Sequence, residues 1–74
     1  MNNLRDKKLL SAFGNHLRQL RKDKNLSLEA LAFEAEVEIS QVFRIEKGII
    51  NPTLSTLSAF AKALGLSLKE LLDF

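Results

Sequence analysis

The sequence predicts an all-α fold built from short helices. Apolar residues recur at spacings of three and four along residues 10–20 and 54–64, which is the spacing of one helix face. Signals for helix ends lie between these stretches, and the chain shows no repeat, linker or low-complexity segment. With 74 residues, 46% of them hydrophobic, we expect one compact domain with a small core. The absence of cysteine excludes a disulfide framework and a thiolate zinc site.

The first predicted helix covers residues 8–23. Its apolar stripe consists of Leu10, Phe13, Leu17 and Leu20. Asn25 follows where the chain must leave the helix, and asparagine tolerates the left-handed backbone conformation that often ends one. His16 lies at the edge of the stripe, and we interpret it as a boundary residue because no carboxylate or serine completes a catalytic set with it. Residues 1–7 are expected to form an N-terminal arm without a fixed structure.

A second, short helix is predicted after Ser27, whose hydroxyl can cap it. Its inner face consists of Leu28, Leu31, Ala32 and Ala35. The next segment is ambiguous, since polar and apolar residues alternate over residues 36–46 in a way that is compatible with a β-hairpin. Read as a helix, the segment has an inner face of Ile39, Val42 and Ile45. Gly48 would then end that helix. The pattern alone leaves both alternatives open.

Two further helices are predicted in the last third of the chain. Pro52 breaks the preceding structure, and Thr53 can cap the next helix. The apolar stripe of that helix consists of Leu54, Leu57, Phe60, Ala61 and Leu64. Gly65 ends it. Ser67 and Glu70 have the spacing of a capping box, which predicts a short last helix.

The net charge of +2 conceals an uneven distribution. Residues 1–24 contain seven basic and two acidic residues, a net charge of +5, whereas residues 25–48 have a net charge of −3. A basic segment can attract phosphate, although the same spacing on a helix is often only a solvated face. No apolar run is long enough to span a membrane, and the N-terminus turns charged too early for a secretory signal. We therefore expect a cytoplasmic protein that does not bind membranes.

A series of short motifs runs through nearly the whole chain. In order they are Leu17–Lys22, Leu26–Ala32, Val37, Ile45–Gly48, Asn51–Leu57 and Ala61–Gly65. In this order and at these spacings they resemble the lambda-repressor-like helix-turn-helix family of XRE or Cro/repressor type. The resemblance implies a compact five-helix DNA-binding domain over residues 8–74, with the helix-turn-helix at about residues 28–47. It also assigns residues 39–47 to a helix and not to a hairpin.

The resemblance implies a sequence-specific transcriptional regulator that binds double-stranded operator DNA. In a helix-turn-helix, the second helix enters the major groove. The expected base contacts are Ser40, Gln41, Phe43 and Arg44. Arg44 is the strongest candidate because a guanidinium can donate two hydrogen bonds to one guanine. Phe43 could contact a thymine methyl group or only pack at the periphery, and the alternative for the polar residues is simple solvation.

Phosphate contacts are expected around the same helix. The candidates are Arg18, Ser27, Leu28, Lys47, Asn51 and Thr53. By the resemblance, Arg21 and Glu46 take the positions of an ion pair that ties the first helix to the end of the third. The alternative is two unconnected surface charges. Arg5, Lys7 and Lys8 lie on or next to the N-terminal arm, where they are either solvated or able to reach a groove.

Three residues depart from the family pattern. Glu36 stands in the turn where glycine is usual, and Glu38 replaces the usual serine or threonine cap. Leu28 replaces a polar residue that often contacts phosphate. Because two acids near the groove oppose phosphate, these departures bear on the strength and sequence preference of DNA binding and leave the fold unaffected.

Apolar residues near the C-terminus exceed what a thin core needs. The expected homodimer interface consists of Leu68, Leu71, Leu72 and Phe74, with core packing as the alternative. A homodimer would bind a palindromic operator. Phe33 is expected to pack. The acidic turn and the surplus apolar residues at positions 43, 49–50 and 68–74 favour a second hypothesis, an antitoxin-like or other protein-interaction module. We expect no catalytic residues, metal site or cofactor, and therefore no enzyme.

Overall fold

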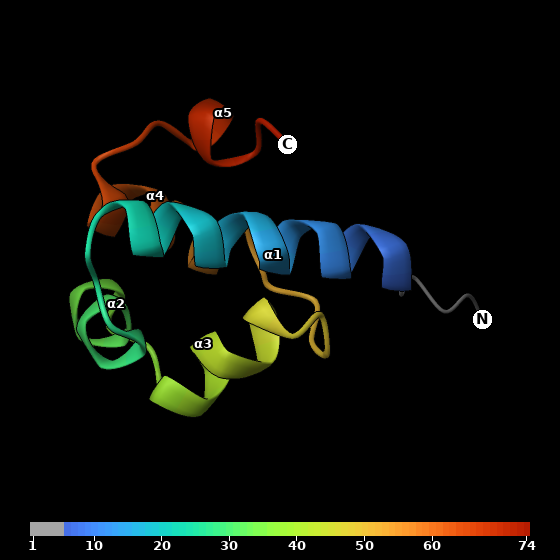
Figure 1. Ribbon diagram of the computed structural model, residues 1–74, viewed down its shortest axis with the longest axis horizontal. Coiled ribbons are helices and arrows are strands. Elements are labelled where there is room, and N and C mark those ends of the chain that lie inside the picture. The colour runs from blue at the N-terminus through green and yellow to red at the C-terminus, as the bar shows by residue number, and fades with distance from the viewer. Residues whose placement is uncertain (1–5) are drawn as a thin grey trace.

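Helix α1, Lys7–Asp23, runs along the length of the molecule, and the other helices pack around it (Figure 1). The computed structural model describes residues 6–74. After α1 it contains α2 (Leu28–Ala35), α3 (Ile39–Glu46), α4 (Leu54–Leu64) and α5 (Leu68–Leu71). α2 and α3 lie on one side of α1, and α5 lies on the other (Figure 1). Residues 6–74 contain no strand, so the all-α fold is confirmed and the hairpin alternative is wrong.

The start of α1 lies one residue earlier than predicted. The Asp6 carboxylate caps the helix by accepting a hydrogen bond from the Leu9 amide at 3.0 Å. Lys7 is therefore helical and Asp6 is its cap, while residues 1–5 of the predicted arm, including Arg5, lie outside the described residues. At the other end, Asn25 adopts a φ of 58°, the left-handed conformation expected of it. Over residues 6–74, no helix has both the length and the apolar composition needed to cross a bilayer.

Side-chain caps begin three other helices. Ser27 and Thr53 each accept a hydrogen bond from the amide three residues later, at 3.0 and 3.1 Å. Ser67 and Glu70 form the expected capping box, in which the Glu70 carboxylate accepts from the Ser67 amide at 2.8 Å and the Ser67 hydroxyl accepts from the Glu70 amide at 3.0 Å. The hydrogen bonds from the Ser67 backbone and then from its side chain hold the pKa of Glu70 below its ordinary value.

The turn between α2 and α3 contains the two unusual acids. Glu36 ends α2 with a φ of 59°, a left-handed conformation that costs a residue with a Cβ atom about 1–2 kcal/mol. Glu38 occupies the N-cap position of α3 but makes no side-chain cap hydrogen bond. Both acidic departures from the family pattern therefore have a structural counterpart.

The core lies between α1 and the helices packed against it. Its largest fully buried side chains are Phe60, Leu17, Leu31, Ile45, Leu71 and Val42. Three sequence predictions are wrong here. Phe33 was expected to pack but is 81% exposed. Ile39 was expected to face inward but is 49% exposed, because α3 packs on α1 by its C-terminal end and Ile39 is the first residue of the helix (Figure 1). Leu71 was expected in a homodimer interface but is 0% exposed, because α5 folds back on α4 and this side chain joins the core.

Gly14 sets how closely α1 and α3 approach each other. A Cβ atom at this buried position would overlap the backbone carbonyl oxygens of Ile45 and Glu46, at the last turn of α3. Because these are backbone atoms, they could not move aside without shifting the helix. Glycine at position 14 thus seats the C-terminal end of α3 directly on α1.

Candidate nucleic-acid interface

The outer face of α3 presents exposed side chains in two rows. Side chains four residues apart lie on the same face of a helix. One row consists of Ile39, Phe43 and Lys47, and the other consists of Ser40 and Arg44. Gln41, the fourth of the predicted base contacts, is half-buried beside them. The opposite face of α3 is buried, so both rows are turned away from the core.

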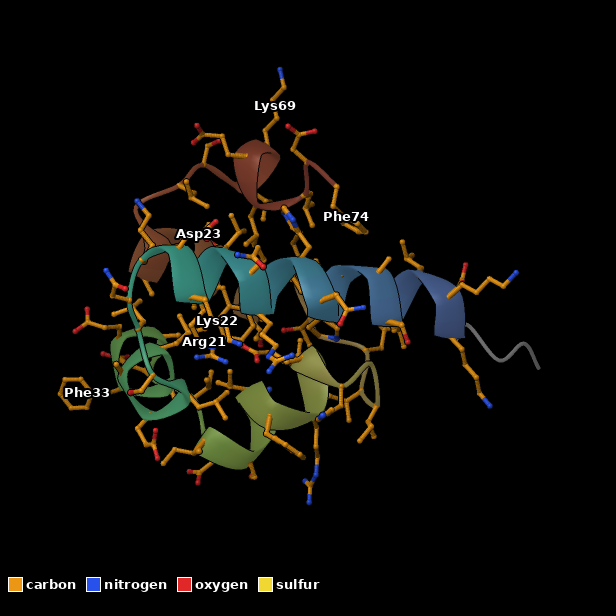
Figure 2. All side chains as sticks on the ribbon, in the orientation of Figure 1. Arg21, Lys22, Asp23, Phe33, Lys69 and Phe74 are labelled. Carbon is orange, nitrogen blue, oxygen red and sulfur yellow. The ribbon has the colours of Figure 1, made fainter. Side chains whose placement is uncertain are left out.

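A bidentate ion pair fastens the end of α3 to α1. The Arg21 Nε donates to Glu46 Oε2 at 2.7 Å, and its Nη2 donates to Glu46 Oε1 at 3.0 Å. A third hydrogen bond runs from Arg21 Nη1 to the carbonyl oxygen of Leu26 at 2.9 Å, which ties in the segment before α2. Figure 2 shows Arg21 on the side of α1 that faces α2 and α3. The ion pair expected from the resemblance is therefore present, and it joins three segments.

Burial makes this ion pair structurally important. Arg21 is 8% exposed and Glu46 is 7% exposed. The hydrogen bond to Glu46 is the main cause that holds the pKa of the Arg21 guanidinium above its ordinary value. Because removal of either partner would leave an uncompensated buried charge, the pair keeps α3 in one orientation on α1.

A polar cleft lies beside this pair, between α1 and α3. Its lining residues are Asn15, Arg18, Arg21, Leu28, Phe43, Glu46 and Lys47, and its volume is about 190 Å³. Arg18 and Lys47 form no ion pair within residues 6–74. Lys47 places its Nζ atom 5.6 Å from the centroid of the Phe43 ring. The cleft thus brings together three of the predicted phosphate contacts, Arg18, Leu28 and Lys47.

The other predicted phosphate contacts lie elsewhere or have a structural role. The hydroxyls of Ser27 and Thr53 cap α2 and α4. Asn51 is exposed and lines a different, apolar cavity of about 310 Å³. Its other lining residues are Leu9, Leu10, Phe13, Pro52, Leu57, Leu72 and Phe74. The structure therefore does not gather all six candidates at one place.

The C-terminal apolar residues divide into a buried group and an exposed group. Leu68 packs partly against the core together with the buried Leu71. Leu72 is 41% exposed and Phe74 is 52% exposed. The Phe74 ring stacks on His16 with the centroids 5.3 Å apart, which holds Phe74 against α1. Of the four predicted interface residues, Leu72, Phe74 and part of Leu68 remain accessible to a second copy.

Sequence reasoning missed two residues of this region. Ile39 belongs to the exposed face of α3, and Gly14 positions α3 on α1. The exposure of Ile39 could have been predicted from its place as the first residue of the helix after Glu38, since the end of a helix often extends beyond its packed part. For Gly14 no local signal exists, because its role depends on backbone atoms of another helix.

Known proteins share both the sequence pattern and the architecture. A family profile described as "Helix-turn-helix" matches residues 17–71. Control protein C.BamHI of Bacillus amyloliquefaciens is 43% identical over 63 residues, which are 84% of this chain and 78% of that protein. The restriction-modification controller protein C.AhdI of Aeromonas hydrophila superposes with a TM-score of 0.81 at 39% identity, covering 86% of this chain and 96% of that one. A chain of the SinR–SinI protein complex superposes with a TM-score of 0.77 at 35% identity, covering 82% of this chain and 60% of that one.

The pair α2 and α3, joined by a tight turn and clamped to α1, defines a helix-turn-helix DNA-binding domain. The chain belongs to the XRE-type helix-turn-helix family and is a DNA-binding transcriptional regulator. This confirms the resemblance. Members of the family act by binding DNA and are generally not enzymes.

Proposed function

We propose that this regulator binds a palindromic operator as a homodimer, with α3 of each copy in the major groove. The observation that carries the proposal is the uncovered face of α3, which presents Arg44 to solvent while Glu46 on its other face is clamped by Arg21. A recognition helix needs both properties, because base edges are read by side chains whose backbone is held in register by a scaffold.

Base contacts in this proposal come from the α3 surface. Arg44 donates two hydrogen bonds to a guanine, Phe43 contacts the apolar edge of a thymine, and Ser40 and Gln41 bond to bases or adjacent phosphates. Exposure supports the assignment for Ser40, Phe43 and Arg44. Gln41 is half-buried, so fewer of its side-chain conformations could contact DNA.

Phosphate contacts in this proposal centre on the polar cleft. Arg18 from α1 and Lys47 from the end of α3 would flank one backbone phosphate, and Leu28 would form the apolar wall of the cleft. The amide end of α2 at Ser27 provides further donors. Asn51 and Thr53 are farther candidates at the start of α4, and they would contact a neighbouring stretch of the backbone.

A second copy would bind at the C-terminal end. Leu72, Phe74 and the accessible part of Leu68 supply apolar surface there, next to the cavity that Phe13 and Leu10 line. Two copies related by twofold symmetry match half-sites one helical turn apart, about 34 Å. Leu71 takes no part, because it is buried within one copy.

The relatives suggest what kind of gene this regulator serves. Because C.BamHI is a control protein and C.AhdI is a restriction-modification controller protein, we propose a controller role of the same kind. The regulator would work in the cytoplasm, where its DNA is, by binding and without catalysis.

The proposal is tested by gel-shift titration of the chain with duplex DNA taken from upstream of its own gene. We expect a complex that weakens steeply with salt, since each phosphate contact by a lysine or arginine adds about one unit to the salt slope. Arg44→Ala should lower the affinity about ten- to hundredfold. Lys69→Ala is the matched control, since Lys69 points away from the molecule on the side opposite α3 (Figure 2). Equal losses for both variants, or no complex at all, would contradict the proposal.

A second function is favoured by one observation on α2. Phe33 is 81% exposed and extends from α2 away from the molecule, within the acidic segment of the chain (Figure 2). Because a comparable chain occurs in the SinR–SinI protein complex, we also propose that this chain acts as an antitoxin-like or other protein-interaction module whose partner binds at this position. Co-purification with the product of an adjacent small gene, lost on Phe33→Ser but not on Arg44→Ala, would support it. Retention of the partner by Phe33→Ser would contradict it.

A further inference from the structure

The row formed by Ile39, Phe43 and Lys47 presents apolar surface where a recognition helix ordinarily meets bases. Ile39 is 49% exposed and Phe43 is 46% exposed. Neither side chain belongs to the buried hydrophobic core. Ile39 is the first residue of α3, and the N-terminal residues of a recognition helix are those that contact base edges.

Chemistry limits what this apolar row can bind in a major groove. The edges of the base pairs present hydrogen-bond donors and acceptors, with one apolar group, the C5-methyl of thymine. An isoleucine and a phenylalanine have no donor or acceptor in their side chains. If they entered the groove opposite donors or acceptors, they would remove water from those groups without replacing its hydrogen bonds.

We propose that Ile39 and Phe43 are specificity-determining residues that select thymine methyl groups in the operator. The inference rests on the proposed function, in which α3 enters the major groove. Arg44, in the adjacent row, selects a guanine, so each half-site contains a guanine flanked by thymines. Ile39, at the start of the helix, contacts a methyl on the side of the half-site that faces the turn, and Phe43 contacts another one turn along α3.

Lys47 has a supporting role in this arrangement. Its ammonium group lies 5.6 Å from the Phe43 ring centroid, an attraction that restricts the rotation of the ring. Both residues also line the polar cleft in which a phosphate is proposed to bind. The phosphate contact and the methyl contact are therefore coupled through one residue pair.

The experiment replaces thymine by deoxyuridine, one position at a time, in an operator selected by the chain from random duplex DNA. This exchange removes a single methyl group and preserves every donor and acceptor. We expect about a fourfold loss of affinity at each contacted thymine, from about 0.8 kcal/mol for one methyl group buried. Thymines outside the contacts should show no loss.

Variants then assign each methyl group to its side chain. Ile39→Ala should bind the thymine and deoxyuridine operators equally at one position and keep the loss at the other, while Phe43→Ala should do the reverse. Ile39→Val, which retains methyl groups at the same place, should keep most of the deoxyuridine effect. Leu54→Ala is the matched control, because Leu54 is an exposed apolar residue outside α3, and it should keep both effects.

The outcomes separate the inference from the proposed function. Tight, salt-sensitive binding with equal affinity for thymine and deoxyuridine at every position would overturn the methyl contacts and leave DNA binding intact. A failure to select any operator would overturn the proposed function itself. Equal deoxyuridine effects in the wild type and in folded Ile39→Ala, checked by circular dichroism, would overturn the role of Ile39.

Discussion

Glu36 adopts a backbone conformation that is unfavourable for glutamate but that the turn between α2 and α3 requires. Its φ of 59° lies in the left-handed region, which glycine adopts without steric cost and glutamate does not. The resemblance to the helix-turn-helix family made this position conspicuous in the sequence, because the turn ordinarily contains glycine there. The strain is local and its removal should not disturb the packing of α2 against α3.

We expect Glu36→Gly to raise the melting temperature by a few degrees. Relief of about 1–2 kcal/mol of strain is partly offset by the greater freedom of glycine in the unfolded chain, which leaves a net gain of about 0.5–1 kcal/mol. Thermal unfolding followed by circular dichroism measures it. Glu36→Gln removes the charge but keeps the Cβ atom, so it should give no comparable gain, and an equal gain would attribute the effect to charge.

The outcome of the other residue-level predictions depended on whether the predicted property was decided by residues nearby in the sequence or by packing against another helix. Periodicity correctly identified Val42 and Ile45 as buried, since they lie in the part of α3 that is covered. It failed for Ile39. The apolar spacing continues to the first residue of α3, whereas the neighbouring helices that would bury this side chain do not extend that far. The capping residues Ser27, Thr53 and Ser67 were found because each acts on amides only three residues away.

At the scale of elements, the contact between α1 and α3 decides how the recognition surface is held. Gly14 allows the helices to touch, and the Arg21–Glu46 pair orients them. The pair was accessible from the sequence through the resemblance. The role of Gly14 was not, because a missing side chain acts here through carbonyl groups 31 and 32 residues later in the chain.

Gly14→Ala provides a test in which two effects have opposite signs. Helix propensity alone would stabilise the variant by about 1 kcal/mol, whereas overlap with the α3 carbonyls should destabilise it by about 1–3 kcal/mol. We expect net destabilisation in urea unfolding, together with weaker operator binding because α3 shifts. Ala12→Gly, at an exposed position of α1, calibrates the propensity effect. A stabilised Gly14→Ala variant would show that the helices do not touch as described.

The capping box of α5 predicts a pH dependence. Because the pKa of Glu70 is lower in the folded state, its contribution to stability is present above the ordinary glutamate pKa and is lost as the pH falls through the folded value. Glu70→Ala should therefore be less stable than the wild type at pH 7, with the difference shrinking as the pH falls below the ordinary glutamate pKa. Urea unfolding across this range measures it. A difference independent of pH would mean that packing, not the charged cap, accounts for the effect.

For the whole molecule, the exposed apolar end raises the question of assembly. The sequence indicated an apolar surplus near the C-terminus, but it could not show that α5 folds back and takes Leu71 into the core. What remains accessible is a smaller surface around Leu72 and Phe74, continuous with an apolar cavity. Only the three-dimensional packing shows which of these residues are buried in the core and which are exposed, because a core and an interface use the same types of apolar side chain.

Leu72→Asp should convert the proposed dimer to a monomer without unfolding it, since Leu72 is 41% exposed in the single copy. Buried against a second copy, a carboxylate would lose its solvation and separate the subunits. Sedimentation equilibrium at micromolar concentrations measures the change, and Phe33→Asp, on the far side of α2, is the control. A wild type that is monomeric at these concentrations would contradict the proposed assembly.

The ion pair between Arg21 and Glu46 has a consequence for the spacing of the operator. Through it α3 moves with α1, and α1 also carries Phe74 stacked on His16 at the apolar end. In the proposed dimer, each copy would therefore hold α3 at a fixed distance and orientation from the symmetry axis. One base pair added between the half-sites rotates one half-site relative to the other by about a tenth of a helical turn. A dimer whose recognition helices are held rigidly cannot follow this rotation.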